Sequence, residues 1–246
     1  MDIKIKNLNK TFKDFHVIKN LNLSINNVNS IGIIGPSGGG KSTFLRILSG
    51  LVPMDSGEIL INNTKINFNN KEEITNYRKS IGVVFQNYNL FPHLTALKNI
   101  VLPLNKIHKV PIKECNERAL HYLEKFHLLE HKDKYPKALS GGQLQRISII
   151  RTLCLNPKII FLDEPTSALD PSFTREVLNT ILDLKKENKE YVIVTHELAF
   201  VKETCDYMIY LEEGTIAHKD YTERFFSNNP NNKSLNNFIN STLSIY

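Results

Sequence analysis

One short stretch limits the fold of this 246-residue chain more than any other, GPSGGGKST at residues 35–43. It fits the pattern G-x-x-x-x-G-K-[S/T] through Gly35, Gly40, Lys41 and Ser42. The apolar run SIGII precedes it and the helical pattern STFLRILSG follows, so the stretch joins a buried strand to a helix. That strand–loop–helix setting is what the motif requires, and it predicts an α/β domain.

A loop of this composition suits phosphate. Its glycines let the backbone curl so that successive N–H groups point inward, and the helix beginning near Lys41 adds partial positive charge. Lys41 is expected to reach the β- and γ-phosphates, while the Ser42 hydroxyl binds Mg²⁺. The predicted phosphate-binding residues are Gly35, Pro36, Ser37, Gly38, Gly39, Gly40, Lys41, Ser42 and Thr43. The chain is therefore predicted to bind a nucleoside triphosphate.

Two carboxylates end another apolar run, KIIFLDEPTSALDP at residues 158–171. Asp163 and Glu164 follow a buried strand at its C-terminal end, where α/β proteins place their ligands. Side chains alternate along a strand, so we expect Asp163 to point towards Mg²⁺ and Glu164 towards an attacking water. The run YVIVTHE likewise places His196 after a buried strand. These residues predict hydrolytic chemistry beside the phosphate loop.

The order of the patterns predicts one α/β domain over residues 1–246 with a helical insertion. Strands are expected at about 2–8, 16–25, 30–34, 57–61, 81–85, 158–162, 191–195, 206–211 and 215–218. Helices are expected at about 41–50, 95–103, 111–127, 142–155, 171–187, 197–204 and 234–243. The core then comprises about 1–86 and 156–246, and a helical subdomain comprises about 87–155.

Composition excludes several other classes of protein. The net charge of +6 would suit a nucleic acid or an anionic membrane, but Lys and Arg are scattered along the chain. Three widely spaced cysteines without a C-x-x-C pair indicate neither a disulfide framework nor a zinc site. The apolar runs are far shorter than the roughly 18 residues that a membrane span needs. We therefore expect no nucleic-acid partner and no membrane crossing by this chain.

The stretch LSGGQLQR at residues 139–146 raises a separate question, because Gly141 and Gly142 stand where a helical pattern begins. Glycine at such a place marks either a simple turn or a backbone that approaches something negatively charged. The residues alone leave both interpretations open.

Six motifs in order, GPSGGGKST, VVFQ, LSGGQ, IIFLDEP, SALD and VTHE, make the chain resemble the nucleotide-binding subunit of ABC transporters over nearly its full length. The resemblance implies a P-loop NTPase core with a mixed sheet, an N-terminal antiparallel β region and an inserted helical subdomain. It implies ATP and Mg²⁺ as ligands, with Phe12 stacked on adenine. Glu164 matches the general base, His196 the switch histidine, and Gln86 the glutamine that touches Mg²⁺ and couples to the membrane subunit.

The same resemblance offers an answer for LSGGQ. In this family the motif faces the γ-phosphate held by a second, head-to-tail subunit. The residues implied to act on the partner's ATP are Ser140, Gly141, Gly142, Gln143 and Asp170. The implied partners are a second ATPase subunit, two transmembrane permease subunits and, through the permease, a solute-binding protein. The implied location is the cytoplasmic face of the bacterial cell membrane.

A narrower resemblance is to the branch serving bacterial importers of polar amino acids. It rests on NLFPHLTALKNIVLPL, YPKALSGGQLQRISIIRTL, LDEPTSALDP and VTHELAFVKE, and on the terminal FFSNNPNNKSLNNFI. The chain departs from the pattern at Gly39, where serine is commoner, and at residues 27–30 (NVNS), where Gly-Glu is usual. Asn tolerates positive φ, so a turn is still expected at Asn27. The stretch AHKDYTERFF lacks the usual glycine-proline pair, which affects only a local turn.

Three other functions compete with amino acid import. An ATPase for export or lipoprotein release would carry nearly the same motifs. A soluble ABC ATPase acting on DNA or ribosomes would usually show a coiled coil, a zinc hook or a second cassette, and this chain has no heptad run. A kinase is disfavoured by LSGGQ and by the lack of a recognisable acceptor-binding insert.

Overall fold

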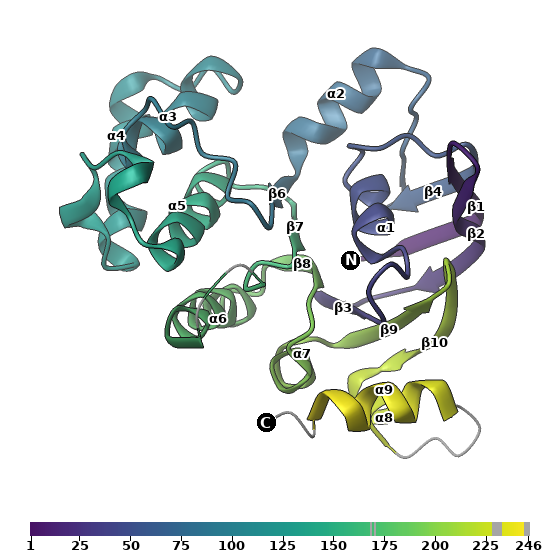
Figure 1. Ribbon diagram of the computed structural model, residues 1–246. Helices are drawn as coiled ribbons and strands as arrows, with labels where there is room; N and C mark the ends of the chain where they lie inside the picture. Colours follow the sequence, from purple (N-terminus) through teal and green to yellow (C-terminus); the bar gives the residue numbers. More distant parts are fainter. Residues whose placement is uncertain (168, 170, 228–232, 244–246) are drawn as a thin grey trace. The chain divides into compact units, whose positions relative to one another are not determined.

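The computed structural model describes residues 1–167, 169, 171–227 and 233–243. The chain forms two compact units (Figure 1). We name Met1–Arg78 with Asn188–Tyr246 the phosphate-loop unit, and Lys79–Glu187 the signature unit. Among the described residues, no helix combines the length and apolar character that a membrane span requires.

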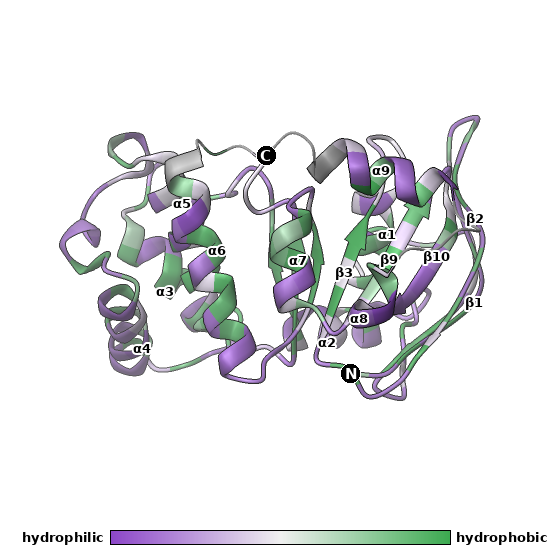
Figure 2. Cartoon of the chain, turned by 90° about the horizontal axis from the view of Figure 1, so that it is seen from below, coloured by the Kyte–Doolittle hydropathy of each residue, from purple (hydrophilic) through white to green (hydrophobic). Residues whose placement is uncertain are grey.

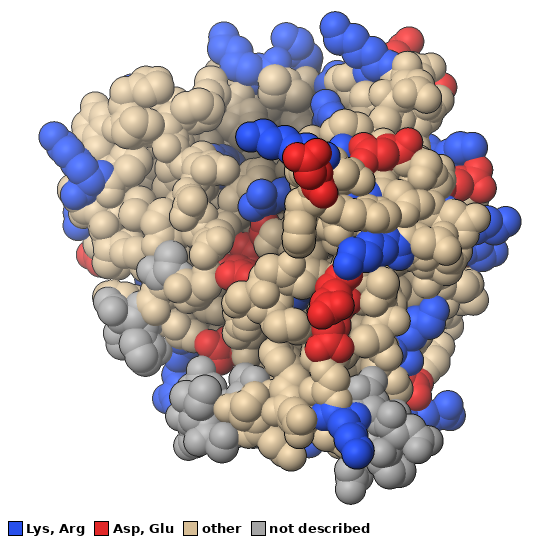
Figure 3. Space-filling view, turned by 45° about the vertical axis from the view of Figure 1, so that its right-hand side comes forward, with Lys and Arg blue, Asp and Glu red and all other residues tan. Residues whose placement is uncertain are grey.

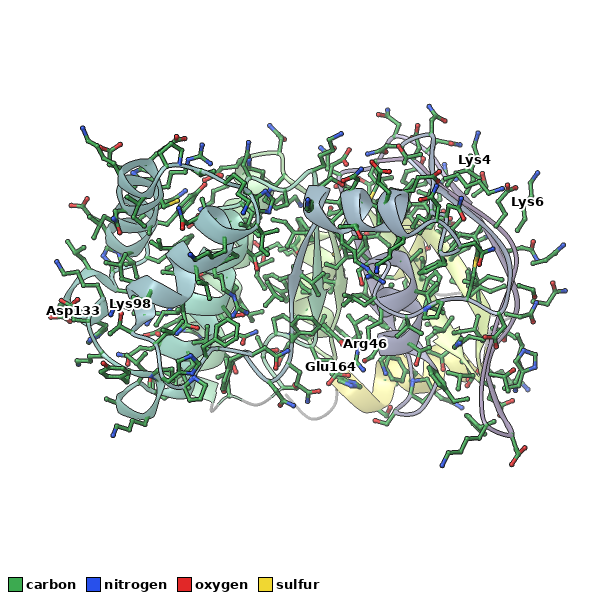
Figure 4. The ribbon with its side chains drawn as sticks, turned by 90° about the horizontal axis from the view of Figure 1, so that it is seen from above. Lys4, Lys6, Arg46, Lys98, Asp133 and Glu164 are labelled. Atoms are coloured by element: carbon green, nitrogen blue, oxygen red, sulfur yellow. The ribbon has the colours of Figure 1, made fainter. Side chains whose placement is uncertain are left out.

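The phosphate-loop unit contains an antiparallel sheet in the order β2 (Phe15–Ile25), β1 (Ile3–Phe12), β4 (Ser56–Ile61) and β5 (Thr64–Lys65). On β1, Ile3, Ile5 and Leu8 are buried, whereas Lys4 and Lys6 point away from the sheet in Figure 4. This alternation of apolar and charged residues is typical of a sheet with one face in water.

A second group of strands in this unit holds the phosphate loop. β3 (Ser30–Ile34) lies parallel to both β8 (Glu190–Val194) and β9 (Tyr207–Glu212), and β10 (Thr215–Tyr221) pairs antiparallel with β9. Every residue of β3 is buried, and the central strands are green in Figure 2. A continuous apolar strand of this kind needs cover on both faces.

Helices complete the phosphate-loop unit. α1 (Lys41–Leu48) follows β3, and α2 (Lys71–Ser80) is tied to the end of α1 by Tyr77, whose hydroxyl donates to the Leu48 carbonyl at 2.6 Å. Further along the chain come α7 (Leu198–Thr204), α8 (Thr222–Phe225) and α9 (Lys233–Leu243), with α9 (yellow in Figure 1) against α7.

The signature unit pairs two short parallel strands with a set of helices. Its elements are β6 (Gly82–Val84), α3 (Ala96–Lys106), α4 (Ile112–Lys125), η1 (Leu129–His131), η2 (Pro136–Ala138), α5 (Gly141–Leu153), β7 (Ile159–Asp163) and α6 (Pro171–Lys186). α4 is mostly purple in Figure 2 and buries a stripe of Cys115, Ala119 and Leu123. This stripe has the three- and four-residue spacing of an amphipathic helix.

Most predicted elements are confirmed, and the α/β interpretation with them. The strand expected at 30–34 has those bounds, and Asn27 adopts φ 56° as the predicted turn requires. The helix expected at 95–103 continues to Lys106, with Pro103 inside it. The sequence prediction missed α2, because Ile74 is its one buried residue and gives no periodic pattern.

Candidate active site

Glycine conformation shapes the phosphate loop between β3 and α1. Gly35 and Gly38 have φ 146° and 78°, values that other residues rarely adopt. A Cβ on Gly35 would lie 2.0 Å from the Leu211 carbonyl oxygen, whereas one on Gly38 would meet nothing within 4 Å. The loop is therefore pressed against the end of β9 on one side and open on the other, as a phosphate cradle requires.

The start of α1 carries the charge of this loop. Gly40 occupies the N-cap position and offers no side chain to the first-turn N–H groups, which suits an anion there. Lys41 is 4% exposed, and its Nζ donates to the carbonyls of Gly35 and Pro36 at 2.9 Å each. Ser42 and Thr43 follow in the first turn, both half-buried. This places an ammonium group and a helix start that no side chain caps within the same few residues.

A pocket of about 470 Å³ opens beside the loop. This volume lies within the range of small-molecule sites. Its lining comprises Phe15, His16, Val17, Lys19, Pro36, Ser37, Gly38, Gly39, Glu212, Glu213 and Gly214. The described lining contains Phe15 but not Phe12, which ends β1 and is 46% exposed. Sequence reasoning missed Phe15, because nothing in the pattern separates the two rings of the β1–β2 hairpin.

His196 lies at the same edge of the phosphate-loop unit. It follows β8, the parallel neighbour of β3, and its side chain is exposed. Parallel strands place their carboxyl ends together, so the loop after β3 and the loop after β8 share this edge. The Thr195 hydroxyl shapes the turn by accepting from the Glu197 N–H at 3.1 Å.

The signature unit brings its predicted polar residues to one edge in the same way. β6 and β7 are parallel, Gln86 follows β6, and Asp163 ends β7. The Asp163 side chain is buried, at 1% exposure, while Gln86 is exposed. Oxygen donors of this type are the ligands that Mg²⁺ prefers.

Strand alternation does not govern the directions of the Asp163 and Glu164 side chains, contrary to the sequence prediction. Glu164 lies beyond the end of β7, with φ 47°, so strand alternation does not apply to it. Its carbonyl accepts from the Ser167 hydroxyl at 3.0 Å, which holds this left-handed turn. Glu164, labelled in Figure 4, is half-buried on this loop. Such a backbone conformation in a residue other than glycine is frequent at functional sites.

The helix start at LSGGQ is a capping box. Ser140 is the N-cap of α5, and its hydroxyl accepts from the Gln143 N–H at 3.3 Å. The Gln143 Oε1 accepts in turn from the Ser140 N–H at 3.0 Å. Gly141 and Gly142 are the first residues of the helix, so the interpretation as a simple turn is wrong.

Packing supplies a further reason for the two glycines. A Cβ on Gly142 would lie 2.7 Å from the Phe173 Cβ, and one on Gly141 would lie 3.1 Å from Leu169 and Tyr88. Sequence reasoning also missed His131, whose Nε2 lies 3.0 Å from the Gln143 Nε2. His131 ends η1, ten positions before α5, where no sequence pattern links it to the motif.

The predicted site residues thus fall into two groups. Gly35–Thr43, Phe12 and His196 belong to the phosphate-loop unit, whereas Gln86, Ser140–Gln143, Asp163 and Glu164 belong to the signature unit. Asp170 lies outside the described residues.

Known proteins match this chain over most of its length. It is 45% identical to the glutamine transport ATP-binding protein GlnQ of Geobacillus stearothermophilus, covering 90% of this chain and 91% of that protein. It is 42% identical to the general L-amino acid transport ATP-binding protein AapP of Rhizobium johnstonii, over 92% and 88%. It is 40% identical to the arginine transport ATP-binding protein ArtM of Bacillus subtilis, over 98% and 100%.

Solved structures confirm the expected P-loop NTPase fold. A dimeric ATP-binding cassette in a post-hydrolysis state, bound to ADP and phosphate, matches with a TM-score of 0.79 and 37% identity, over 89% of this chain and 98% of that one. The cbiO1 protein of Clostridium perfringens, part of the transporter complex cbiONQ, matches with a TM-score of 0.80 and 29% identity, over 99% and 96%. The sequence pattern of the ABC transporter family matches residues 18–167. This chain belongs to the ABC transporter family.

Proposed function

We propose that this chain is the ATP-hydrolysing subunit of a bacterial ABC importer for a polar, glutamine-like amino acid. The chemistry is supported by the open phosphate loop, where Lys41 and the uncapped start of α1 provide an anion site. The cargo class is supported by GlnQ, AapP and ArtM, all of which are named for amino acid transport. The single observation that carries the cargo proposal is the 45% identity to GlnQ over nine-tenths of the chain.

In this proposal the phosphate loop binds ATP. Main-chain N–H groups of Gly38–Lys41 hold the phosphates, the Lys41 ammonium neutralises the β- and γ-phosphates, and an aromatic ring at Phe12 stacks on adenine. Lys41 already reaches into the loop through its two carbonyl contacts, so its ammonium needs little movement to meet a phosphate.

Mg²⁺ fits the oxygen donors that the chain supplies. Ser42, Gln86 and the buried Asp163 would hold it, and when bound it would neutralise charge on the phosphate oxygens. Glu164 accepts a proton from the attacking water, and His196 donates a hydrogen bond to the γ-phosphate. The water oxygen bonds to the γ-phosphorus, and the bond from that phosphorus to the bridging oxygen breaks with its electron pair staying on ADP, so hydrolysis yields ADP and phosphate.

The proposed assembly contains two ATPase subunits, with Ser140, Gly141, Gly142, Gln143 and Asp170 of each acting on the ATP of the other. Support comes from the solved dimeric cassette and from the start of α5, where two glycines leave the main chain without side chains. Two transmembrane permease subunits and a solute-binding protein complete the importer, which puts this chain on the cytoplasmic face of the cell membrane. Lys and Arg side chains are spread among acidic ones over the face in Figure 3, and we propose no nucleic-acid partner.

The proposed roles in ATP binding and in partner contact are divided between the two predicted parts of the chain. We propose that residues of about 1–86 and 156–246 form the ATP-binding core, and that the helical subdomain of about 87–155 carries the signature motif. Gln86, at the junction of these segments, then reports the nucleotide state to the permease.

Reconstitution tests the proposed function. The chain is purified with its permease, inserted into liposomes, and assayed for ATPase activity with the solute-binding protein and a panel of amino acids. We expect one polar amino acid, glutamine foremost, to stimulate hydrolysis and to accumulate in the liposomes. Active ATPase with no response to any amino acid would reject the cargo and favour export or lipoprotein release.

A further inference from the structure

The loop after β6 carries Gln86 and then follows a backbone path that ordinary residues avoid. Tyr88 and Asn89 stand next to each other with φ 49° and 50°. In this left-handed region the Cβ of any residue other than glycine crowds the backbone, and bulky residues are uncommon there. Strain of this kind persists only where surrounding groups hold the backbone, and it clusters at functional sites. We name this pair of residues the left-handed turn.

Two side chains of α5 hold the left-handed turn. The Arg151 Nη1 donates to the Asn89 carbonyl at 2.6 Å, and its Nη2 donates to the Tyr88 carbonyl at 3.0 Å. The hydroxyl of Ser148, a fully buried residue, donates to the same Tyr88 carbonyl at 3.1 Å. Three hydrogen bonds, two of them from a charged group, therefore fix the directions of both carbonyls.

The charge of Arg151 is used on main-chain carbonyls. Burial lowers the pKa of its guanidinium. No ion pair among the described residues includes Arg151. A charge withdrawn from water is normally paired with an opposite charge, because removing it from water costs free energy. A guanidinium that meets two carbonyls instead indicates that holding the left-handed turn is its purpose.

Tyr88 also reaches the other end of the same helix. A Cβ on Gly141 would lie 3.1 Å from the Tyr88 hydroxyl oxygen, so this hydroxyl lies beside the first residue of α5. The Tyr88 carbonyl is held by Ser148 and Arg151, which lie in the second half of α5. The helix that begins with the signature motif therefore contacts the left-handed turn at both ends.

The residue before Gln86 is held by this helix as well. α5 packs against β6 (Figure 1), and the Gln145 Nε2 donates to the Phe85 carbonyl at 3.4 Å. We propose that Arg151 is a positioning residue, which locks the left-handed turn and so fixes Gln86 relative to α5. The inference rests on the proposed function, in which Gln86 holds Mg²⁺. Arg151 acts on hydrolysis through the loop and is not a catalytic residue.

Steady-state hydrolysis by the purified chain tests this proposal. Arg151→Lys keeps the positive charge but cannot bond to two carbonyls as the forked guanidinium does. We expect kcat to fall about 3- to 10-fold while the KM for ATP stays unchanged, because the phosphate loop is untouched. Ser148→Ala is a second, milder variant that removes one bond to the Tyr88 carbonyl, and it should lower kcat about 2- to 3-fold.

Two double variants separate positioning from general stability. Glycine adopts positive φ without steric cost, so Asn89→Gly added to Arg151→Lys should restore most of the lost kcat. In a Gln86→Ala background Arg151→Lys should cause no further loss, because the residue that it positions is gone. A merely structural arginine would give neither result.

Arg146→Lys is the matched control. Arg146 also lies on α5, but its guanidinium donates to the Phe126 carbonyl at 2.9 Å and pairs with Glu176 at 2.9 Å. Whatever activity this variant loses, Asn89→Gly should not restore it. Thermal melts check that each variant folds, and Ser148→Ala carries the same double-variant tests if Arg151→Lys does not fold.

Three results would overturn the inference and leave ATP hydrolysis intact. The first is parental kcat in both Arg151→Lys and Ser148→Ala. The second is a further loss of the full size when Arg151→Lys is added to Gln86→Ala, which would show that the two residues act independently. The third is a failed rescue by Asn89→Gly at unchanged thermal stability. A parent protein that hydrolysed no ATP would instead reject the proposed function, and this inference with it.

Discussion

The two units hold their parts of the candidate site by different physical means. In the phosphate-loop unit the main chain provides most of the binding groups, and glycine is required where the loop meets β9. In the signature unit the side chains of Asp163 and Glu164 would provide the proposed chemistry, and a side-chain capping box fixes the start of α5. A site made by the main chain is lost when its backbone moves, whereas one made by side chains can lose its chemistry with the fold intact.

This difference predicts that substitutions in the two units separate two steps. Changes in the phosphate loop should remove nucleotide binding, and therefore hydrolysis and ATP-driven assembly as well. Changes in the signature unit should leave binding in place and affect hydrolysis or assembly. Measuring ATP affinity and turnover for each variant distinguishes the two outcomes.

Glu164→Gln should give the largest effect on turnover. It removes the proposed proton acceptor while keeping the size of the side chain, so hydrolysis should slow by about 10²–10⁴-fold. The affinity for ATP should stay unchanged. Because hydrolysis no longer reopens the assembly, the variant should elute as an ATP-dependent dimer in gel filtration.

The matched control for this experiment is Glu197→Gln, a half-buried carboxylate directly after His196 in the other unit. It should retain most of the parental turnover. A Glu164→Gln protein that stayed monomeric in saturating MgATP would count against a composite site shared by two subunits.

Gly35→Ala should give the largest effect on binding. Its φ of 146° and the 2.0 Å approach of its Cβ to the Leu211 carbonyl force the loop or β9 to move. Severe backbone strain costs several kcal/mol, so we expect ATP affinity to fall by about 100-fold or more. Gly38→Ala also places alanine at a positive φ, but its Cβ meets no atom within 4 Å. It therefore measures the loss of ATP affinity that comes from backbone conformation alone. Equal losses in both variants would refute the importance of the contact with β9.

The sequence could predict the elements that carry a repeating pattern or a motif in the required setting. β3, the phosphate loop and α1 follow from an apolar run, spaced glycines and an amphipathic helix. α2 could not be found in this way, since a helix that buries only Ile74 has no apolar face to recognise.

Contacts between residues far apart in the sequence could not be predicted, for a related reason. Strand alternation was expected to turn the Asp163 and Glu164 side chains in different directions, but Glu164 lies beyond the strand in a left-handed turn, where alternation does not apply. Neither the approach of Gly142 to Phe173 nor the place of Phe15 in the pocket has a local signal. These features depend on which surfaces pack together, and a single sequence does not show that.

Gly142→Ala tests whether the glycines of the signature motif serve packing or phosphate. The added Cβ lies 2.7 Å from the Phe173 Cβ, and such overpacking typically costs about 1–3 kcal/mol of stability. A lower midpoint of urea unfolding is the expected result. Adding Phe173→Gly, which removes that Cβ, should restore part of the lost stability; if ATP-driven dimerisation returns as well, the glycine serves packing alone. Recovery of stability without dimerisation would assign Gly142 a role at the partner's phosphate.

His131→Ala should give the smallest effect of these variants on the protein's activity, and it tests the capping box directly. Since the Gln143 Oε1 accepts from the Ser140 N–H, the Gln143 Nε2 is the donor and the His131 Nε2, at 3.0 Å, the acceptor. Removing that acceptor frees the Gln143 side chain and costs about 0.5–1.5 kcal/mol at the start of α5. We therefore expect ATP-driven dimerisation in sedimentation experiments to weaken about 3- to 10-fold at unchanged ATP affinity. His131→Gln, which keeps an acceptor, should restore it, and the exposed His121→Ala in α4 should behave as the parent. An equal fall in ATP affinity would show that the capping box supports the nucleotide of its own chain.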